Sequence, residues 1–92
     1  MNITDVSVRL IENDPKLKGI VNITIDDAFA VHDIKVIEGE HGLFIAMPSV
    51  KRKDGKFRDL FHPINSNTRE ELQTLIINKY NQVLAEGPKE QI

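Results

Sequence analysis

The sequence contains no cysteine and no tryptophan, and it has no long apolar run. The lack of cysteine excludes disulfide scaffolds, thiolate-ligated metal sites and thiol nucleophiles. It also fits a reducing compartment, so we expect a cytoplasmic protein. No apolar stretch approaches ~18 residues, and residues 1–5 lack the basic and apolar regions of a secretory signal. We therefore expect neither a membrane-spanning helix nor a signal peptide.

Aromatic side chains are also scarce, at 5% of the 92 residues, so the core must be built from aliphatic residues. A content of 40% hydrophobic and 28% charged residues is compatible with folding. The length allows one domain, which we expect to span residues 1–86. Residues 87–92 begin with Gly87 and Pro88, which end the predicted helix, and are expected to form a disordered tail.

The net charge of −2 argues weakly against nucleic acid as a partner, but the charge is unevenly distributed. Residues 51–58 read Lys-Arg-Lys-Asp-Gly-Lys-Phe-Arg, with five basic residues and one acid, for a net charge of +4. The remaining 84 residues carry a net charge of −6. One short segment thus concentrates positive charge on an acidic protein.

Three segments in the first half of the chain have the alternation of half-buried strands. Residues 3–12 and 18–26 form a predicted hairpin, whose inward side chains are Val6, Val8, Leu10, Val21, Ile23 and Ile25. Residues 28–38 change phase along their length. A β-bulge near His32 and Asp33 would reconcile the two phases.

Residues 67–86 have the spacing of an amphipathic helix. Asn67 is the predicted N-cap, with Glu70 at N3 and Glu71 beside it in the first turn. The apolar stripe comprises Leu72, Leu75, Ile76, Tyr80, Val83 and Leu84. The sequence therefore predicts an α+β fold: a small antiparallel sheet of four to five strands with one C-terminal helix packed on one face.

A single helix covers only one face of such a sheet. Ile3, Ile11 and Ile20 are expected on the other face, and residues 43–47 are apolar on both sides, as in a central or interface strand. The simplest way to cover these side chains is a homodimer. The predicted interface residues are Leu43, Ile45 and Met47.

Catalysis has little support in the sequence. His32, His41 and His62 lie in different segments without metal-ligand spacing, and His62 is explained more simply as a hydrogen-bonded side chain at a strand end. The sequence has neither a Gly-rich phosphate loop nor a nucleophile elbow. We expect no enzyme activity, no metal, no cofactor and no small-molecule substrate.

The basic segment has two interpretations. It can be a solvated loop kept charged for solubility, or a nucleic-acid contact that Pro48 and Gly55 allow to project from the sheet. Residues 59–64 could form a short closing strand after it. Phe57 lies between Lys56 and Arg58, where its ring could stack on a base while cations neutralise phosphates. The ring could equally fold back onto the core.

Residues 47–64, which read Met-Pro-Ser-Val-Lys-Arg-Lys-Asp-Gly-Lys-Phe-Arg-Asp-Leu-Phe-His-Pro-Ile, resemble the bacterial septation-protein family typified by stage V sporulation protein G. Residues 3–9 and 29–37 resemble it too. The resemblance covers about residues 1–85. It implies a small, non-catalytic, dimeric regulator of septation, sporulation and related gene expression that binds DNA and RNA. It also implies that the C-terminal helix influences sequence preference.

Carried onto this chain, the resemblance assigns nucleic-acid binding to Lys51, Arg52, Lys53, Lys56 and Arg58, and the residue pattern adds Phe57. The favoured hypothesis is a homodimer whose basic loops contact nucleic acid. The alternative is a protein-interaction adaptor in cell division, which would use an apolar sheet face or edge.

Overall fold

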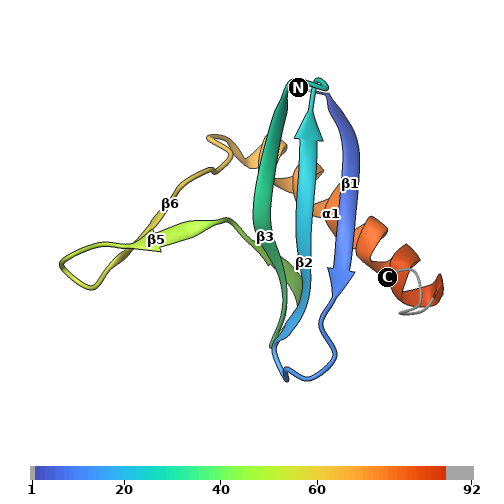
Figure 1. Ribbon diagram of the computed structural model, residues 1–92. Helices are drawn as coiled ribbons and strands as arrows, with labels where there is room; N and C mark the ends of the chain where they lie inside the picture. The colour runs from blue at the N-terminus through green and yellow to red at the C-terminus, as the bar shows by residue number, and fades with distance from the viewer. Residues whose placement is uncertain (1, 87–92) are drawn as a thin grey trace.

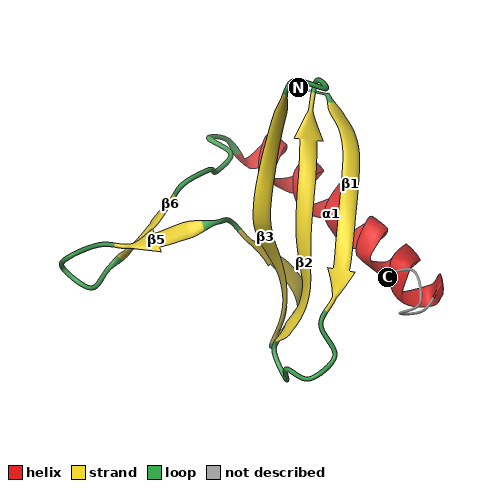
Figure 2. Cartoon of the chain, viewed as in Figure 1, coloured by secondary structure: helices red, strands yellow, loops and turns green. Residues whose placement is uncertain are grey.

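The computed structural model describes residues 2–86. A four-stranded antiparallel sheet in the order β1-β2-β3-β4 is followed by a separate two-stranded hairpin and one helix (Figures 1 and 2). The elements are β1 (Ile3–Leu10), β2 (Leu17–Ile25), β3 (Phe29–Gly39), β4 (Gly42–Ala46), β5 (Ser49–Lys51), β6 (Phe57–Asp59) and α1 (Ser66–Glu86). The predicted α+β class is confirmed; the predicted tail lies outside the described residues.

Local side-chain chemistry shapes the turns of the sheet. Before β2, the Asp14 Oδ1 accepts the N–H groups of Lys16 and Leu17, both at 2.8 Å. The hydrogen bond from Leu17, followed by that from Lys16, lowers the pKa of Asp14. Between β2 and β3, Asp26 and Asp27 have φ angles of 53° and 51°. Two residues in this conformation match the twist of a tight hairpin.

The predicted bulge in β3 is confirmed. Val21 pairs with Ile34 and Ile23 pairs with Val31, so His32 and Asp33 together lie opposite one residue of β2. Asp33 has a φ of 68°, and its N–H donates to the Asn22 Oδ1 at 3.2 Å. The extra residue restores the phase, so Ile34 is buried and Val31 packs against the same core.

A second bulge, at the start of β1, corrects the prediction for Ile3. Ile3 pairs with Ile25, whereas Asp5 pairs with Thr24, so Thr4 is an extra residue in β1. The Thr4 hydroxyl accepts the N–H of Asp27 at 3.1 Å. Because of this shift, Ile3 packs against the core on the helix side of the sheet instead of facing away from it.

The helix begins earlier than predicted, and its cap is Asn65 rather than Asn67. The Asn65 Oδ1 accepts the N–H of Thr68 at 2.8 Å, and the Asn65 carbonyl accepts the N–H of Arg69 at 3.2 Å. Both bonds belong to an N-cap residue. Asn67 lies inside the helix, and the first turn contains no acid. Glu70 therefore does not complete a capping box.

The core lies between α1 and one face of the sheet. Val21, Ile34, Val36 and Ile76 have no exposed surface. The predicted apolar stripe of the helix was too wide: Leu72, Ile76, Tyr80 and Val83 are buried, whereas Leu75 is 39% exposed and Leu84 is 52% exposed. A helix on a sheet buries only the side chains nearest the line of contact, and Leu75 and Leu84 lie to either side of that line.

No helix within residues 2–86 has the length and apolarity needed to span a membrane.

Candidate nucleic-acid interface

The basic segment forms a hairpin arm, which we define as residues 48–60. Figure 1 shows β5 and β6 extending away from the sheet and the helix. Every residue from 49 to 60 is exposed. The predicted projecting arm is confirmed. The predicted closing strand at residues 59–64 is wrong: β6 spans Phe57–Asp59 and pairs with β5, outside the main sheet.

A tight turn closes the arm at its tip. The N–H of Arg52 donates to the Lys56 carbonyl at 2.7 Å, and the N–H of Gly55 donates to the Arg52 carbonyl at 3.0 Å. Gly55 has a φ of +85°, a conformation that glycine adopts without a steric cost. The Asp54 Oδ1 accepts the N–H of Lys56 at 3.0 Å. Asp54 is thus engaged in shaping the turn.

Strand pairing separates the side chains of the arm into two faces. Val50 pairs with Arg58, and the hydrogen bond from Arg52 to Lys56 continues that ladder toward the tip. Directly paired residues lie on one face, and successive residues alternate between faces. We call the side that carries Arg52, Lys56 and Arg58 the cationic face.

The other side of the arm, which we call the aromatic face, carries Lys51, Phe57 and Asp59. Lys51 pairs with Phe57 and Ser49 pairs with Asp59. The cations that flank Phe57 in the sequence therefore point away from its ring, and Lys51 is the cation on the same face. Successive side chains in a strand point to opposite faces, and this rule alone could have assigned the residues of the arm to its two faces from the sequence.

Phe57 does not fold back onto the core. Its side chain is 71% exposed. Phe61, four residues later, is half-buried and packs against the core. The arm therefore presents one free aromatic ring, and the segment after it is fixed to the domain by a second ring.

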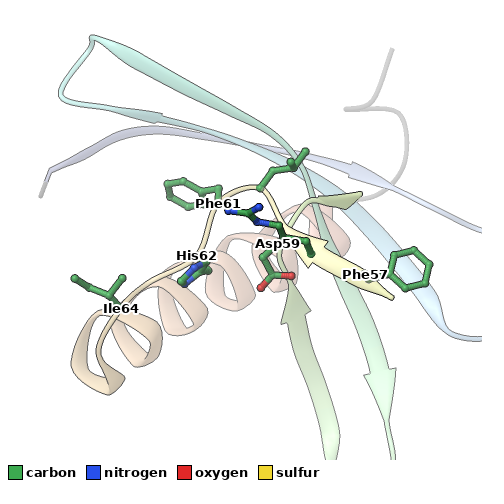
Figure 3. A pocket seen from close by; sticks show the side chains of 7 residues that line it. Phe57, Asp59, Phe61, His62 and Ile64 are labelled. Carbon is green, nitrogen blue, oxygen red and sulfur yellow. The ribbon is translucent and has the colours of Figure 1, made fainter. Parts of the chain in front are cut away.

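An open hollow of about 730 Å³ lies along β6 and the segment that leads to the helix. In the view of Figure 3, Asp59 lies between Phe57 and His62, and Phe61 and Ile64 lie farther along the wall. Arg58 and Leu60 complete the lining. Aromatic rings, a carboxylate and an imidazole thus border one solvent-open space, a combination that suits a planar heterocycle better than an extended apolar ligand.

The structure places the three predicted interface residues in the protein's own core. Ile45 is 1% exposed, Met47 is 7% exposed, and Leu43 is half-buried against the same cluster. Within the single chain, their side chains pack in the core between the sheet and α1. β4 is an edge strand rather than a central one. A second copy would have to use the opposite side of β4.

The β4 edge of the sheet is partly covered by a side chain of the helix. The backbone N–H of Ile45, on edge strand β4, donates to the Gln73 Oε1 of the helix at 3.4 Å. Covering an edge N–H in this way hinders the addition of another strand there. No sequence pattern indicated this role for Gln73, because only the packing of α1 beside β4 brings the amide to the edge.

The sheet face away from the helix is partly apolar. Ile20, Ile37 and Phe44 alternate with buried residues, so they point away from the core, and Ile37 pairs with Phe44. Phe44 is 40% exposed. Arg9 and Lys35 pair with Ile20 from the two sides. We call Ile20, Ile37 and Phe44 the open-face cluster.

Within residues 2–86, no three His, Asp or Glu side chains are grouped so that they could hold a metal ion. The His62 Nδ1 lies 3.1 Å from the Pro63 carbonyl oxygen. The contact fits the interpretation of His62 as a hydrogen-bonded side chain, but His62 does not lie at a strand end, because β6 ends at Asp59.

Comparison with known proteins identifies the family. A model of the SpoVG family matches residues 1–82. The chain is 62% identical over 80 residues to a protein of Agathobacter rectalis named as septation protein SpoVG, covering 87% of this chain and 92% of that one. It is 58% identical over 87 residues to a protein of the same name from Lachnoclostridium phytofermentans, covering 95% and 94% of the two chains. The chain belongs to the SpoVG family.

Proposed function

We propose that the chain is a cytoplasmic, homodimeric regulator that acts in septation and sporulation-related gene expression by binding DNA and RNA through the arm. The role in septation follows the name shared by its relatives. The observation that carries the binding proposal is the cationic face, on which Arg52, Lys56 and Arg58 project together from an exposed hairpin. Binding, rather than catalysis, is the activity that this surface supports.

The physical basis of binding is the release of condensed counterions. Each Lys or Arg that meets a phosphate displaces cations from the nucleic acid and supplies affinity that does not depend on sequence. The rest of the protein is acidic, so contact is favoured only where the arm projects. Lys51 on the aromatic face and Lys53 in the turn extend the positive field around the three cations.

Homodimerisation would place two arms on one nucleic acid. The open-face cluster is the surface that favours a second copy, because its apolar side chains are only partly covered. A stable dimer commonly buries about 800 Å² on each partner. The adaptor hypothesis uses the same cluster for a different protein, and the oligomeric state in solution discriminates between the two.

The test is a titration of labelled duplex DNA and single-stranded RNA across several salt concentrations. Three contacts per arm and two arms give six phosphates, so log K should fall with log salt at a slope of about −5 for the duplex and about −4 for the single strand. Replacing Arg52, Lys56 and Arg58 by alanine should remove most of that slope.

The matched control replaces three cations of the sheet region, Lys16, Lys18 and Lys35, by alanine. It changes the net charge by the same amount but leaves the arm intact, so the slope should stay near that of the parent. A folded arm variant that keeps the parent's affinity and slope would overturn the proposal. So would equal losses in the two triple variants, because the location of the charge would then be irrelevant.

A further inference from the structure

The outer edge of β6 presents an alternating row of side chains to solvent. β6 pairs with β5 on one side only. Along this edge Lys56 and Arg58 project to the cationic face, and Phe57 and Asp59 project to the aromatic face. Residues two apart in a strand are about 6.6 Å from each other, which is close to the distance between successive phosphates in an extended single strand. The phosphates of one such nucleic-acid strand can therefore follow the cationic face while its bases follow the aromatic face.

Asp59 is the unexpected member of this row. A carboxylate opposes the binding of phosphate, and yet it lies on the same short strand as Arg58. Asp54, the other acid of the arm, is engaged in the turn through its bond with Lys56. Within residues 2–86, no hydrogen bond or ion pair involves the Asp59 carboxylate. Both of its oxygens are free to accept hydrogen bonds from a ligand.

We propose that the β6 edge holds an extended single strand of RNA or DNA and that Asp59 selects guanine. This inference rests on the proposed nucleic-acid function. Lys56 and Arg58 contact successive phosphates, Phe57 stacks on one base, and Asp59 accepts hydrogen bonds from the Watson–Crick edge of the next. The hollow bordered by Asp59 and His62 gives that base room (Figure 3).

Guanine is favoured because of the chemistry of its Watson–Crick edge. It presents two adjacent donors, the N1–H and the N2 amino group, which match the two oxygens of a carboxylate. Adenine, cytosine and uracil each place an acceptor beside their donor, and that acceptor repels a carboxylate. A duplex hides this edge in base pairs, so selection requires an unpaired strand.

The test uses fluorescence anisotropy with labelled uridine nonamers that carry guanine, inosine or adenine at the central position. The parent protein should bind the guanine oligonucleotide about tenfold more tightly than the adenine one, the effect of one good bidentate contact. Inosine, which lacks the N2 amino group, should fall between them. The deoxythymidine versions of the same oligonucleotides should give the same order.

The decisive variant is Asp59→Asn, whose amide presents one donor and one acceptor. It should bring the ratio of guanine to adenine affinity close to one while the affinity for the adenine oligonucleotide is kept or increased. The matched control, Asp54→Asn, removes the same charge from the arm and should retain the tenfold ratio. Circular dichroism checks that both variants are folded.

The outcomes separate this inference from the proposed function. Salt-dependent binding by the parent without preference for guanine overturns the inference alone. A preference that survives in Asp59→Asn also overturns it, because the selection would then come from another residue. The absence of binding to every oligonucleotide at 50 mM salt overturns both.

Discussion

Gly19 lies against the ring of Tyr80, and this contact fixes the second half of the helix to the centre of the sheet. A Cβ at Gly19 would lie 3.3 Å from the Tyr80 Cδ1, closer than side chains normally approach. Glycine on β2 thus leaves room for an aromatic ring from α1. Tyr80 is 6% exposed. Burial raises the pKa of Tyr80 above its ordinary value of 10.0, and the Glu38 carboxylate raises it further.

The raised pKa of Tyr80 predicts a loss of stability in alkali. Its folded pKa lies above the unfolded one, so the contribution is complete below about pH 10 and is lost as the pH rises through the folded pKa. Urea unfolding between pH 7 and pH 11 should show a falling free energy of unfolding at the alkaline end. Tyr80→Phe should fall less steeply there. The two proteins differ only in this hydroxyl, so identical slopes would contradict the assignment.

Ile76 anchors the helix to the sheet, and its truncation should cost much of the domain's stability. The side chain has no exposed surface. Ile76→Ala removes buried methyl groups and leaves a cavity, at a cost of about 2–5 kcal/mol in the free energy of unfolding. Leu75→Ala is the matched control, because the Leu75 side chain neighbours Ile76 in the helix but is 39% exposed. Equal costs for the two variants, measured by chemical unfolding, would contradict the observed packing.

The sequence could predict those parts of the fold that depend on alternation within one segment. The apolar pattern of β1, β2 and β3 specified three strands and even the bulge at His32 and Asp33, because a change of phase is visible along the chain. The position of Ile3 was beyond such reasoning. At the bulge, the Thr4 hydroxyl accepts a hydrogen bond from the N–H of Asp27. This contact exists only once β2 has paired with β1.

The helix cap and the burial of residues 43–47 illustrate the same limit. Asn65 and Asn67 are both suitable caps by residue type, and only the path of the chain after Pro63 decides between them. Ile45 and Met47 appear available for an interface until α1 is known to cover them. In the arm, Phe57 is exposed because no helix or strand within residues 2–86 packs over its ring, and a local sequence pattern cannot reveal this.

We expect the second copy of the proposed homodimer to bind at the open-face cluster. Phe44 is 40% exposed, and its ring lies against Gly39 on the sheet face away from the helix. In a two-fold symmetric contact each substituted residue meets the same surface of the other copy. Phe44→Glu would place a carboxylate in that apolar contact. It should convert a dimer of about twice 10.5 kDa into a monomer.

Sedimentation at micromolar concentration measures this change directly. Phe57→Glu is the matched control, since it introduces the same charge at an exposed ring on the arm and should leave the dimer intact. A parent protein that sediments as a monomer contradicts the homodimer. The same cluster would then favour the adaptor hypothesis.

The two phenylalanines that flank the end of β6 should respond in opposite ways to truncation. Phe57 is 71% exposed, so Phe57→Ala should leave the melting temperature unchanged. If its ring stacks on a base, the affinity for single-stranded nucleic acid should fall by about 1–3 kcal/mol for each stacked base. Phe61 is half-buried against the core. Phe61→Ala should therefore lower the melting temperature, which Phe57→Ala should not.

The comparison of these two variants isolates the role of the exposed ring from general damage to the arm. Differential scanning calorimetry gives the stability of each, and anisotropy with a uridine oligonucleotide gives the binding. Stacking depends on the face of the ring, so Phe57→Tyr should preserve affinity, whereas Phe57→Leu retains apolar area without a π-system and should not. Leucine that substitutes fully for Phe57 would show that the ring contributes only apolar contact, and base stacking on the arm would have to be abandoned.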